Sequence, residues 1–238
     1  MPVTQARSTP QPFDDVRDLA MRPSVSDPSA AQSVYDALLG MGREGDFGRL
    51  GDGAAWLAEW QKRYPPRLEM PTLAIFAGSH GISETGVTLS SNQSTRDKVE
   101  ALREGRAPLS AIATQVEVNI RVFELAIDQP TPNFAEEAAM SERECAATIA
   151  YGFEALEGSP DLVALGVIGA GIGTSAAAVA CALYGGSPEY WVRPGPLVPK
   201  EMNQQRVDIV SQALKTHRGH LSDPLEALRC LGGRELAA

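Results

Sequence analysis

Apolar residues recur at two alternating spacings along the 238-residue chain. Three short apolar runs have the length and composition of β-strands, at 72–78, 116–127 and 162–168. Elsewhere the apolar positions repeat at helical intervals or follow helix-start signals, which predicts helices over 95–104, 141–157, 176–184, 204–217 and 223–231. Because strands alternate with helices, we expect an α/β fold with a doubly wound, mostly parallel sheet.

The first 70 residues differ from this pattern. Residues 1–30 are rich in Ser, Pro, Gln and Asp, so we expect a poorly ordered lead-in. Helical spacing begins at Pro28 and again at Asp52, with the glycine-rich connection GREGDFGRLG between the two segments. The sequence thus predicts an N-terminal helical arm over 31–70 and an α/β domain over 71–238.

The end of the chain is less regular. Tyr190 to Pro199 contains three prolines, which exclude a central strand and predict an ordered loop. Arg234 to Ala238 has the composition of the opening turn of a helix.

Composition and charge restrict the class of ligand. The chain has 21 basic and 30 acidic residues, a formal net charge of -9, which disfavours binding to nucleic acid or to an anionic membrane. Its three cysteines have no metal-ligand spacing, and no apolar run is long enough to cross a bilayer. We expect a cytoplasmic protein with a small-molecule or protein partner.

The segment GVIGAGIGTS, residues 166–175, lies between a predicted strand and a predicted helix. Glycines allow close approach of a ligand, and free amides at a helix start attract anions. The segment lacks the lysine of a Walker loop and the acidic residue of a dinucleotide site. Two interpretations stay open, phosphate binding and tight packing of the helix against the sheet.

Histidines are the other candidates for chemistry. His80 follows the first predicted strand, where open α/β sheets bind ligands, and either acts as a general acid or base or hydrogen-bonds to the loop backbone. His217 and His220 are three residues apart without a third ligand, so a solvated helix end is favoured over a metal site. We expect no metal.

Several segments together, in order, carry a resemblance to a known family. They are GDFGRLGDGAAWLAEWQ, TLAIFAGSHGISETGV, TRDKVEALREGRAPLSAIA, PTPNFAEEAAMSERECAATIAYG, DLVALGVIGAGIGTSAAA and DPLEALRCLGGRELAA. From about Gly45 to the last residue, the chain resembles the nicotinate-nucleotide:dimethylbenzimidazole phosphoribosyltransferases of cobalamin lower-ligand synthesis. That resemblance implies transfer of phosphoribose from nicotinate mononucleotide to a benzimidazole, without a cofactor, in a homodimer.

The resemblance also implies roles for individual residues. Eight positions match motif positions that contact substrate: the glycine-loop residues Gly169, Gly171, Thr174 and Ser175, the base-pocket residues His80, Gly81 and Asp97, and Arg206 in place of a phosphate-binding lysine. Asp97 stands where the family has a glutamine.

The sequence departs from the family motifs in three places. Val167, Ile172 and Gly173 replace a Glu, an Asn and a Thr of the glycine loop. The loop GRGTG becomes RPGPL, in which Arg193 takes the place of the first glycine and Pro196 has no amide hydrogen. The family also continues past GGRELAA to its general-base glutamate. We therefore expect the α/β domain to be truncated at its C-terminal end.

These departures leave three hypotheses open. In the first, a second copy or a complete homologue supplies the base to an active complex. In the second, the chain is a catalytically inactive sensor or regulator that binds a benzimidazole, a nucleotide or α-ribazole phosphate. In the third, it is a remnant without activity.

Overall fold

A three-stranded parallel sheet organises the computed structural model, which describes residues 11–43 and 45–238. The strands are β1 (Pro71–Ala77), β2 (Asn119–Glu124) and β3 (Leu162–Ile168), in the order β2-β1-β3. Both strand pairs are parallel, and Ile75 of β1 lies opposite Val122 on one side and Gly166 on the other. The predicted α/β fold with a parallel sheet is confirmed.

The central strand is the most buried. Six of the seven residues of β1 are buried, as expected for a parallel strand covered on both faces. Strand β3 also has an apolar sequence, but it lies at the edge of the sheet, and its Leu165 and Val167 are exposed.

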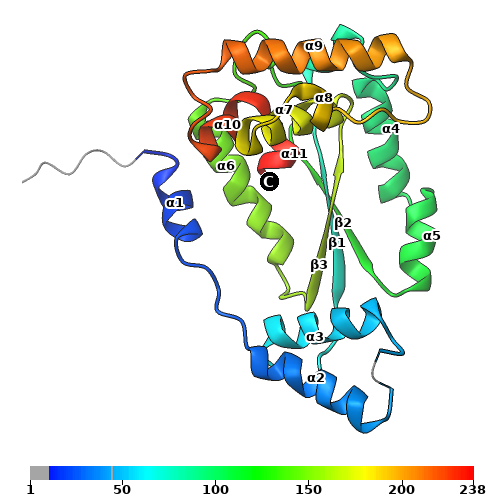
Figure 1. Ribbon diagram of the computed structural model, residues 1–238. Helices are drawn as coiled ribbons and strands as arrows, with labels where there is room; N and C mark the ends of the chain where they lie inside the picture. Colours follow the sequence, from blue (N-terminus) through cyan, green and yellow to red (C-terminus); the bar gives the residue numbers. More distant parts are fainter. Residues whose placement is uncertain (1–10, 44) are drawn as a thin grey trace, which may run out of the picture.

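Helices flank the strands and collect at their carboxyl ends (Figure 1). On one side lie α4 (Asn92–Arg103) and α5 (Pro108–Gln115), and on the other lies α6 (Glu142–Gly152). Above the sheet are the remaining helices, which are α7 (Ile172–Tyr184), α8 (Pro188–Trp191), α9 (Lys200–Thr216), α10 (Pro224–Leu231) and α11 (Arg234–Ala237). Short 3₁₀ turns, η1 (Gly81–Thr85) and η2 (Phe153–Leu156), follow β1 and α6.

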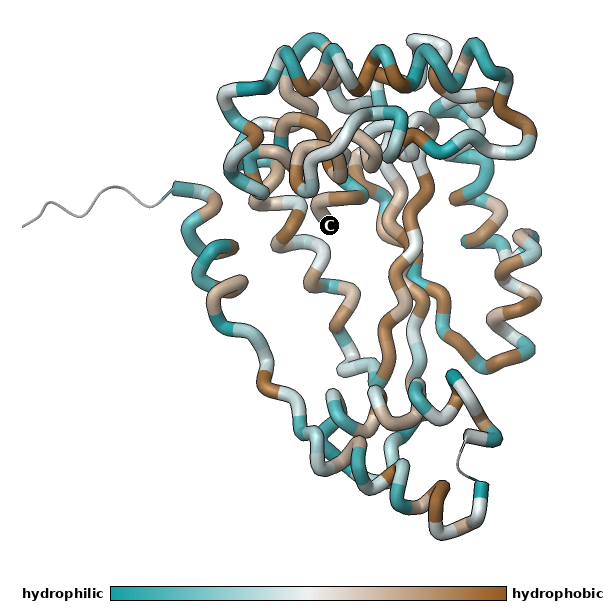
Figure 2. The backbone as a smooth tube through the Cα atoms, viewed as in Figure 1, coloured by the Kyte–Doolittle hydropathy of each residue, from teal (hydrophilic) through white to brown (hydrophobic). Residues whose placement is uncertain are grey.

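The main core lies between α7 and α9. Val207, Val210 and Ala213 form the buried face of α9 and pack in one cluster with Ala178 and Cys181 of α7. Figure 2 shows the resulting alternation of hydrophilic and hydrophobic residues along α9. The helical spacing of apolar residues in α9 thus indicates which face of the helix is buried.

The N-terminal arm lies at the opposite end of the sheet (Figure 1). Helices α2 (Pro28–Gly40) and α3 (Arg49–Gln61) pack through small residues, and Asp27 caps α2 by accepting a hydrogen bond from the Ser29 amide (3.0 Å). Of the predicted lead-in, residues 1–10 lie outside the described part, and Asp14–Ala20 form α1.

Several element boundaries differ from the sequence predictions. Helix α5 was not predicted, β2 is shorter than 116–127, and α7 begins inside the glycine segment. The predicted loop over 190–199 starts within α8, because Ser187 and Pro188 provide a helix start. Across residues 11–43 and 45–238, no helix combines the length and the apolar character that crossing a bilayer requires.

Candidate functional site

The chain turns sharply after β3, at Gly169, Ala170 and Gly171. Gly171 has φ +90°, a conformation that disfavours side chains, and it is the N-cap of α7. The Ala170 amide donates to Oγ1 of the buried Thr95, on α4, at 3.2 Å. Thr95 therefore fixes the glycine turn from a different element of the fold.

One flank of this turn is closed by a buried pair, His80 and Glu235. Both side chains are 1% exposed, and His80 Nε2 contacts Glu235 Oε1. A Cβ on Gly169 would lie 2.7 Å from Glu235 Oε1, so only glycine fits there without displacement. His80 Nδ1 and Glu235 Oε2 have no hydrogen-bond partner among the described residues. The close approach at Gly169 is made by a carboxylate of the chain itself.

Neighbouring polar groups tie the loops together. The Ser79 hydroxyl donates to the Ile127 carbonyl (2.6 Å), and the Ser175 hydroxyl donates to the Leu231 carbonyl (2.7 Å). The Gly81 amide donates to the Thr131 carbonyl oxygen (2.8 Å), and a Cβ on Gly81 would lie 2.7 Å from that oxygen. The predicted site residues Gly81 and Ser175 therefore make structural contacts in this arrangement.

The other flank of the turn opens into a cavity of about 340 Å³. Its walls come from α7, α8, α9 and the segment after α8, through Gly173, Thr174, Ala176, Ala177, Ala180, Trp191, Val192, Arg193 and Arg206. A Cβ on Gly173 would meet nothing within 4 Å, so open space lies directly beside this part of the helix start.

The lining of the cavity carries positive charge. Arg206 is part-buried and donates through Nε to the Val87 carbonyl, and burial lowers the pKa of its guanidinium. Within the described ranges, neither Arg206 nor Arg193 makes a salt bridge. The cavity runs along the first half of α7, so the positive end of the helix dipole lies beside it. The amides of Thr174 and Ser175 already donate to the Gly171 carbonyl, so α7 acts there mainly through its field.

Much of the remaining lining is apolar. Three alanines of α7 and Trp191 contribute to the walls. The Trp191 indole is held in place because its Nε1 donates to the Gly185 carbonyl at 2.7 Å. Cationic and apolar side chains in one cavity suit a ligand with an anionic group and a planar ring.

The cavity brings together some of the predicted residues and leaves others apart. Thr174 and Arg206 line it, and Gly169 and Gly171 form the adjacent turn. Asp97 is exposed on α4, where its carboxylate accepts from Gln93 (2.8 Å) and lines a different hollow.

The prediction of a solvated helix end was wrong for one histidine. His217 is buried, and its Nε2 lies 2.8 Å from the Phe134 carbonyl oxygen. His220 is exposed beside Glu226. In the described part of the chain, no group of three or more metal-ligating side chains comes together.

Sequence reasoning missed Thr95 and Glu235, and it noted Arg193 without a role. The sequence around Thr95 and Glu235 does not indicate a role for them, because each is far from the glycine turn along the chain and contacts it only in the folded structure. The replacement of a neutral loop position by Arg193 was the available signal for the second cation.

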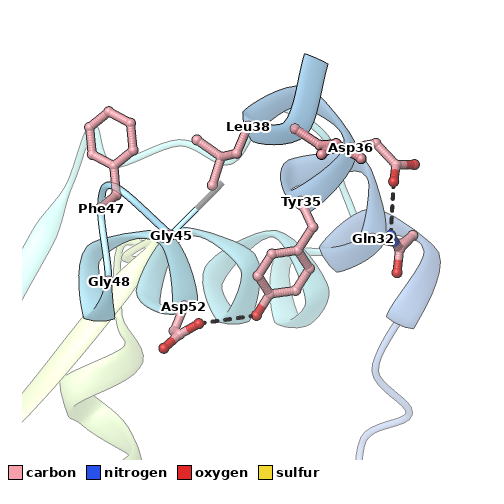
Figure 3. A pocket seen from close by; sticks show the side chains of 10 residues that line it. Gln32, Tyr35, Asp36, Leu38, Gly45, Phe47, Gly48 and Asp52 are labelled. Atoms are coloured by element: carbon pink, nitrogen blue, oxygen red, sulfur yellow. Dashed lines mark hydrogen bonds between the residues drawn. The ribbon is translucent and has the colours of Figure 1, made fainter. Parts of the chain in front are cut away.

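A second hollow of similar volume, about 340 Å³, lies in the N-terminal arm (Figure 3). Tyr35 donates to Asp52 (3.4 Å), and Gln32 donates to Asp36 (2.8 Å). Its charged side chains are carboxylates, and it lies at the other end of the sheet from the glycine turn. Such a hollow disfavours an anion, which the arginine-lined cavity favours.

Comparisons with known proteins show the family of the chain. A family model described as phosphoribosyltransferase, DBI_PRT, matches residues 27–238. Nicotinate-nucleotide–dimethylbenzimidazole phosphoribosyltransferases of Brucella canis and Brucella suis are each 42% identical to the chain over 228 residues. These alignments cover 95% of this chain and 67% of each relative.

Two solved structures from Thermus thermophilus share the fold. One, titled CobT, has a TM-score of 0.74 and 27% identity, over 81% of this chain and 63% of that one. The other is titled a nicotinate-nucleotide-dimethylbenzimidazole phosphoribosyltransferase, with a TM-score of 0.77 and 27% identity, over 89% and 68%. The chain thus spans about two thirds of the length of these proteins. By sequence and by fold, it belongs to the DBI_PRT phosphoribosyltransferase family.

Proposed function

We propose that this chain takes part in phosphoribosyl transfer from nicotinate mononucleotide to 5,6-dimethylbenzimidazole, which releases nicotinate and gives α-ribazole 5′-phosphate. The observation that carries the proposal is Arg206. It is a part-buried cation without a carboxylate partner among the described residues, and it lines the cavity at the start of α7. The names of the Brucella relatives support the same reaction.

The cationic and the apolar side chains of the cavity suit the two parts of the substrate. Arg206 and the positive end of α7 would hold the 5′-phosphate. The alanine wall and Trp191 would contact the planar base, where exclusion of water strengthens each electrostatic contact. His80, Gly81 and Asp97, which the resemblance assigns to the base, do not line this cavity: His80 is buried, and Asp97 lies at a different hollow.

The azole must lose a proton as its nitrogen bonds to the ribose carbon. No carboxylate is found among the residues that line the cavity. We therefore propose that the proton acceptor comes from outside these walls, in a homodimer or in a heterodimer with a complete homologue. The chain that completes the binding surface for the base then decides which azole is preferred.

The experiment is an assay of the purified chain with nicotinate mononucleotide and dimethylbenzimidazole, alone and mixed with a complete homologue made inactive at its own phosphate-binding site. Mass spectrometry would detect α-ribazole phosphate. We expect product in the mixture, and at least roughly 100-fold less with Arg206→Met, because a buried charged contact is worth about 3 kcal/mol.

A matched control is Arg218→Met, which removes an exposed cation just beyond the other end of the same helix. This variant should keep full activity. Absence of product in every combination would contradict the proposed function. Product from the chain alone would contradict only the need for a complete homologue, because a homodimer of this chain would then supply the proton acceptor.

A further inference from the structure

The segment that joins α8 to α9 brings a second cation to the cavity. Arg193 lines the same walls as Arg206, although it comes from a different element of the fold. Its guanidinium carbon lies 5.4 Å from the centre of the Tyr190 ring. The reaction as proposed assigns no role to this side chain.

We propose that Arg193 is a second anion-binding side chain, which together with Arg206 grips the doubly charged phosphate monoester of the ligand. This inference rests on the proposed function and deepens it, because it assigns the phosphate to a pair of arginines. The ligand class is a sugar phosphate dianion.

The local charge favours an anion beside the two arginines. Arg193 and Arg206 both line one cavity, and neither is neutralised by a carboxylate within the part of the chain that the structure describes. The chain as a whole has a net charge of -9, so this concentration of positive charge is local. Two like charges facing one space repel each other, and a dianion between them relieves that repulsion.

Aromatic side chains hold Arg193 in advance of binding. Arg193 stacks over Tyr190, whose ring meets Trp191 edge to face at 5.1 Å, and Trp191 is anchored to Gly185 through its indole nitrogen. Cation–π stacking holds a guanidinium without using all its donors. The planar fork therefore remains able to donate to phosphate oxygens, with less conformational entropy left to lose.

The backbone of the same segment makes a side-chain donor necessary. Pro194 and Pro196 have no amide hydrogens, so residues 193–197 offer a phosphate fewer main-chain donors than a glycine-rich loop would. A guanidinium supplies several N–H donors from one side chain. Arg193 thus provides donors in a segment whose prolines have removed them.

Calorimetry with ribose 5-phosphate tests the inference, because binding of this probe needs neither the base nor the proton acceptor. Unphosphorylated ribose serves as the ligand control. We expect Arg193→Ala to raise the Kd for ribose 5-phosphate roughly 10-fold, and Arg206→Ala roughly 100-fold, as expected for one exposed and one part-buried charged contact. Arg193→Lys should recover part of the loss, because lysine keeps the charge but not the fork.

Two further measurements exclude a structural or a general electrostatic effect. Arg218→Ala removes an equal charge about 18 Å from Arg206 along the direction of α9 and should leave the Kd unchanged. Protonating the phosphate, whose second pKa is about 6, should weaken binding to the native chain more than to Arg193→Ala, because the second cation favours the dianion.

The inference is overturned if Arg193→Ala binds ribose 5-phosphate as tightly as the native chain, or if Arg218→Ala loses as much affinity. Failure of the native chain to bind this probe would also overturn it. If binding depends on Arg193 but no α-ribazole phosphate forms in the assay above, the anion site stands and the proposed function fails.

Discussion

Polar side chains lie on both flanks of the glycine turn, but their surroundings differ. On one flank, His80 and Glu235 are nine-tenths or more buried and contact each other. On the other, Arg193 and Arg206 face an open cavity without an acidic partner among the described residues. Polar side chains that contact each other in a dry interior hold loops together, whereas unpaired charges at an opening remain available to a ligand.

Two glycines of the segment 166–175 have different surroundings. Gly169 is required by the approach of Glu235, and Gly173 borders empty space. A glycine-rich segment after a strand is therefore not one functional unit. In this chain, Gly169 is needed for packing, and Gly173 borders the cavity.

Replacement of Glu235 by alanine should have the largest effect. The His80 ring would lose the side-chain partner that the described interior gives it, so we expect the free energy of unfolding to fall by about 3 kcal/mol. Urea denaturation followed by circular dichroism measures this change. Glu226→Ala, at a part-exposed pair on α10, should cost less than about 1 kcal/mol. Equal losses in the two variants would remove the distinction between the flanks.

Alanine at Gly169 and at Gly173 should have opposite effects. At Gly169 the new methyl group would clash with Glu235, at a cost of about 2 kcal/mol in unfolding free energy. At Gly173, inside α7, alanine should raise stability by about 0.5–1 kcal/mol through helix propensity. Thermal denaturation compares the two variants, and ribose 5-phosphate should bind Gly173→Ala more weakly because the methyl group enters the cavity. If both variants lose stability alike, Gly173 does not border free space.

Replacement of Thr95 by valine should destabilise the chain less than the changes at Glu235 and Gly169. Valine keeps the shape but removes the acceptor for the Ala170 amide, so we expect a loss of about 1 kcal/mol in unfolding free energy. Hydrogen exchange should become faster at Ala170 while remaining unchanged in β2. Unchanged exchange at Ala170 would show that Thr95 does not hold the turn.

The sequence predicted the regular elements well where one periodicity dominated. Strand β3 was found at 162–168 as predicted, and Ser141 caps α6 through the Glu144 amide (3.1 Å). The Glu144 carboxylate, three residues after the cap, accepts from Arg234 Nε (2.7 Å). Local chemistry thus predicted where the helix begins. The partner of the Glu144 side chain, in contrast, is a residue 90 positions away.

The burial of β3 was not predictable from its residues. LVALGVI has the composition of a strand covered on both faces, and yet Leu165 is 74% exposed, because β1 rather than β3 occupies the centre of the sheet. The order of the strands is a long-range property. Nothing in the run itself distinguishes an edge strand from a central one.

The amino-acid sequence by itself determined the alternation of strands and helices, the glycine turn, the apolar face of α9 and the family. Those features depend on spacing, backbone freedom and motifs within short segments. Only the tertiary structure decided that Glu235 closes one flank of the turn and that Arg193 joins Arg206 at the other. These contacts join residues that are far apart along the chain or lie in different elements. Burial and charge then give each contact its role, and both are properties of the folded chain.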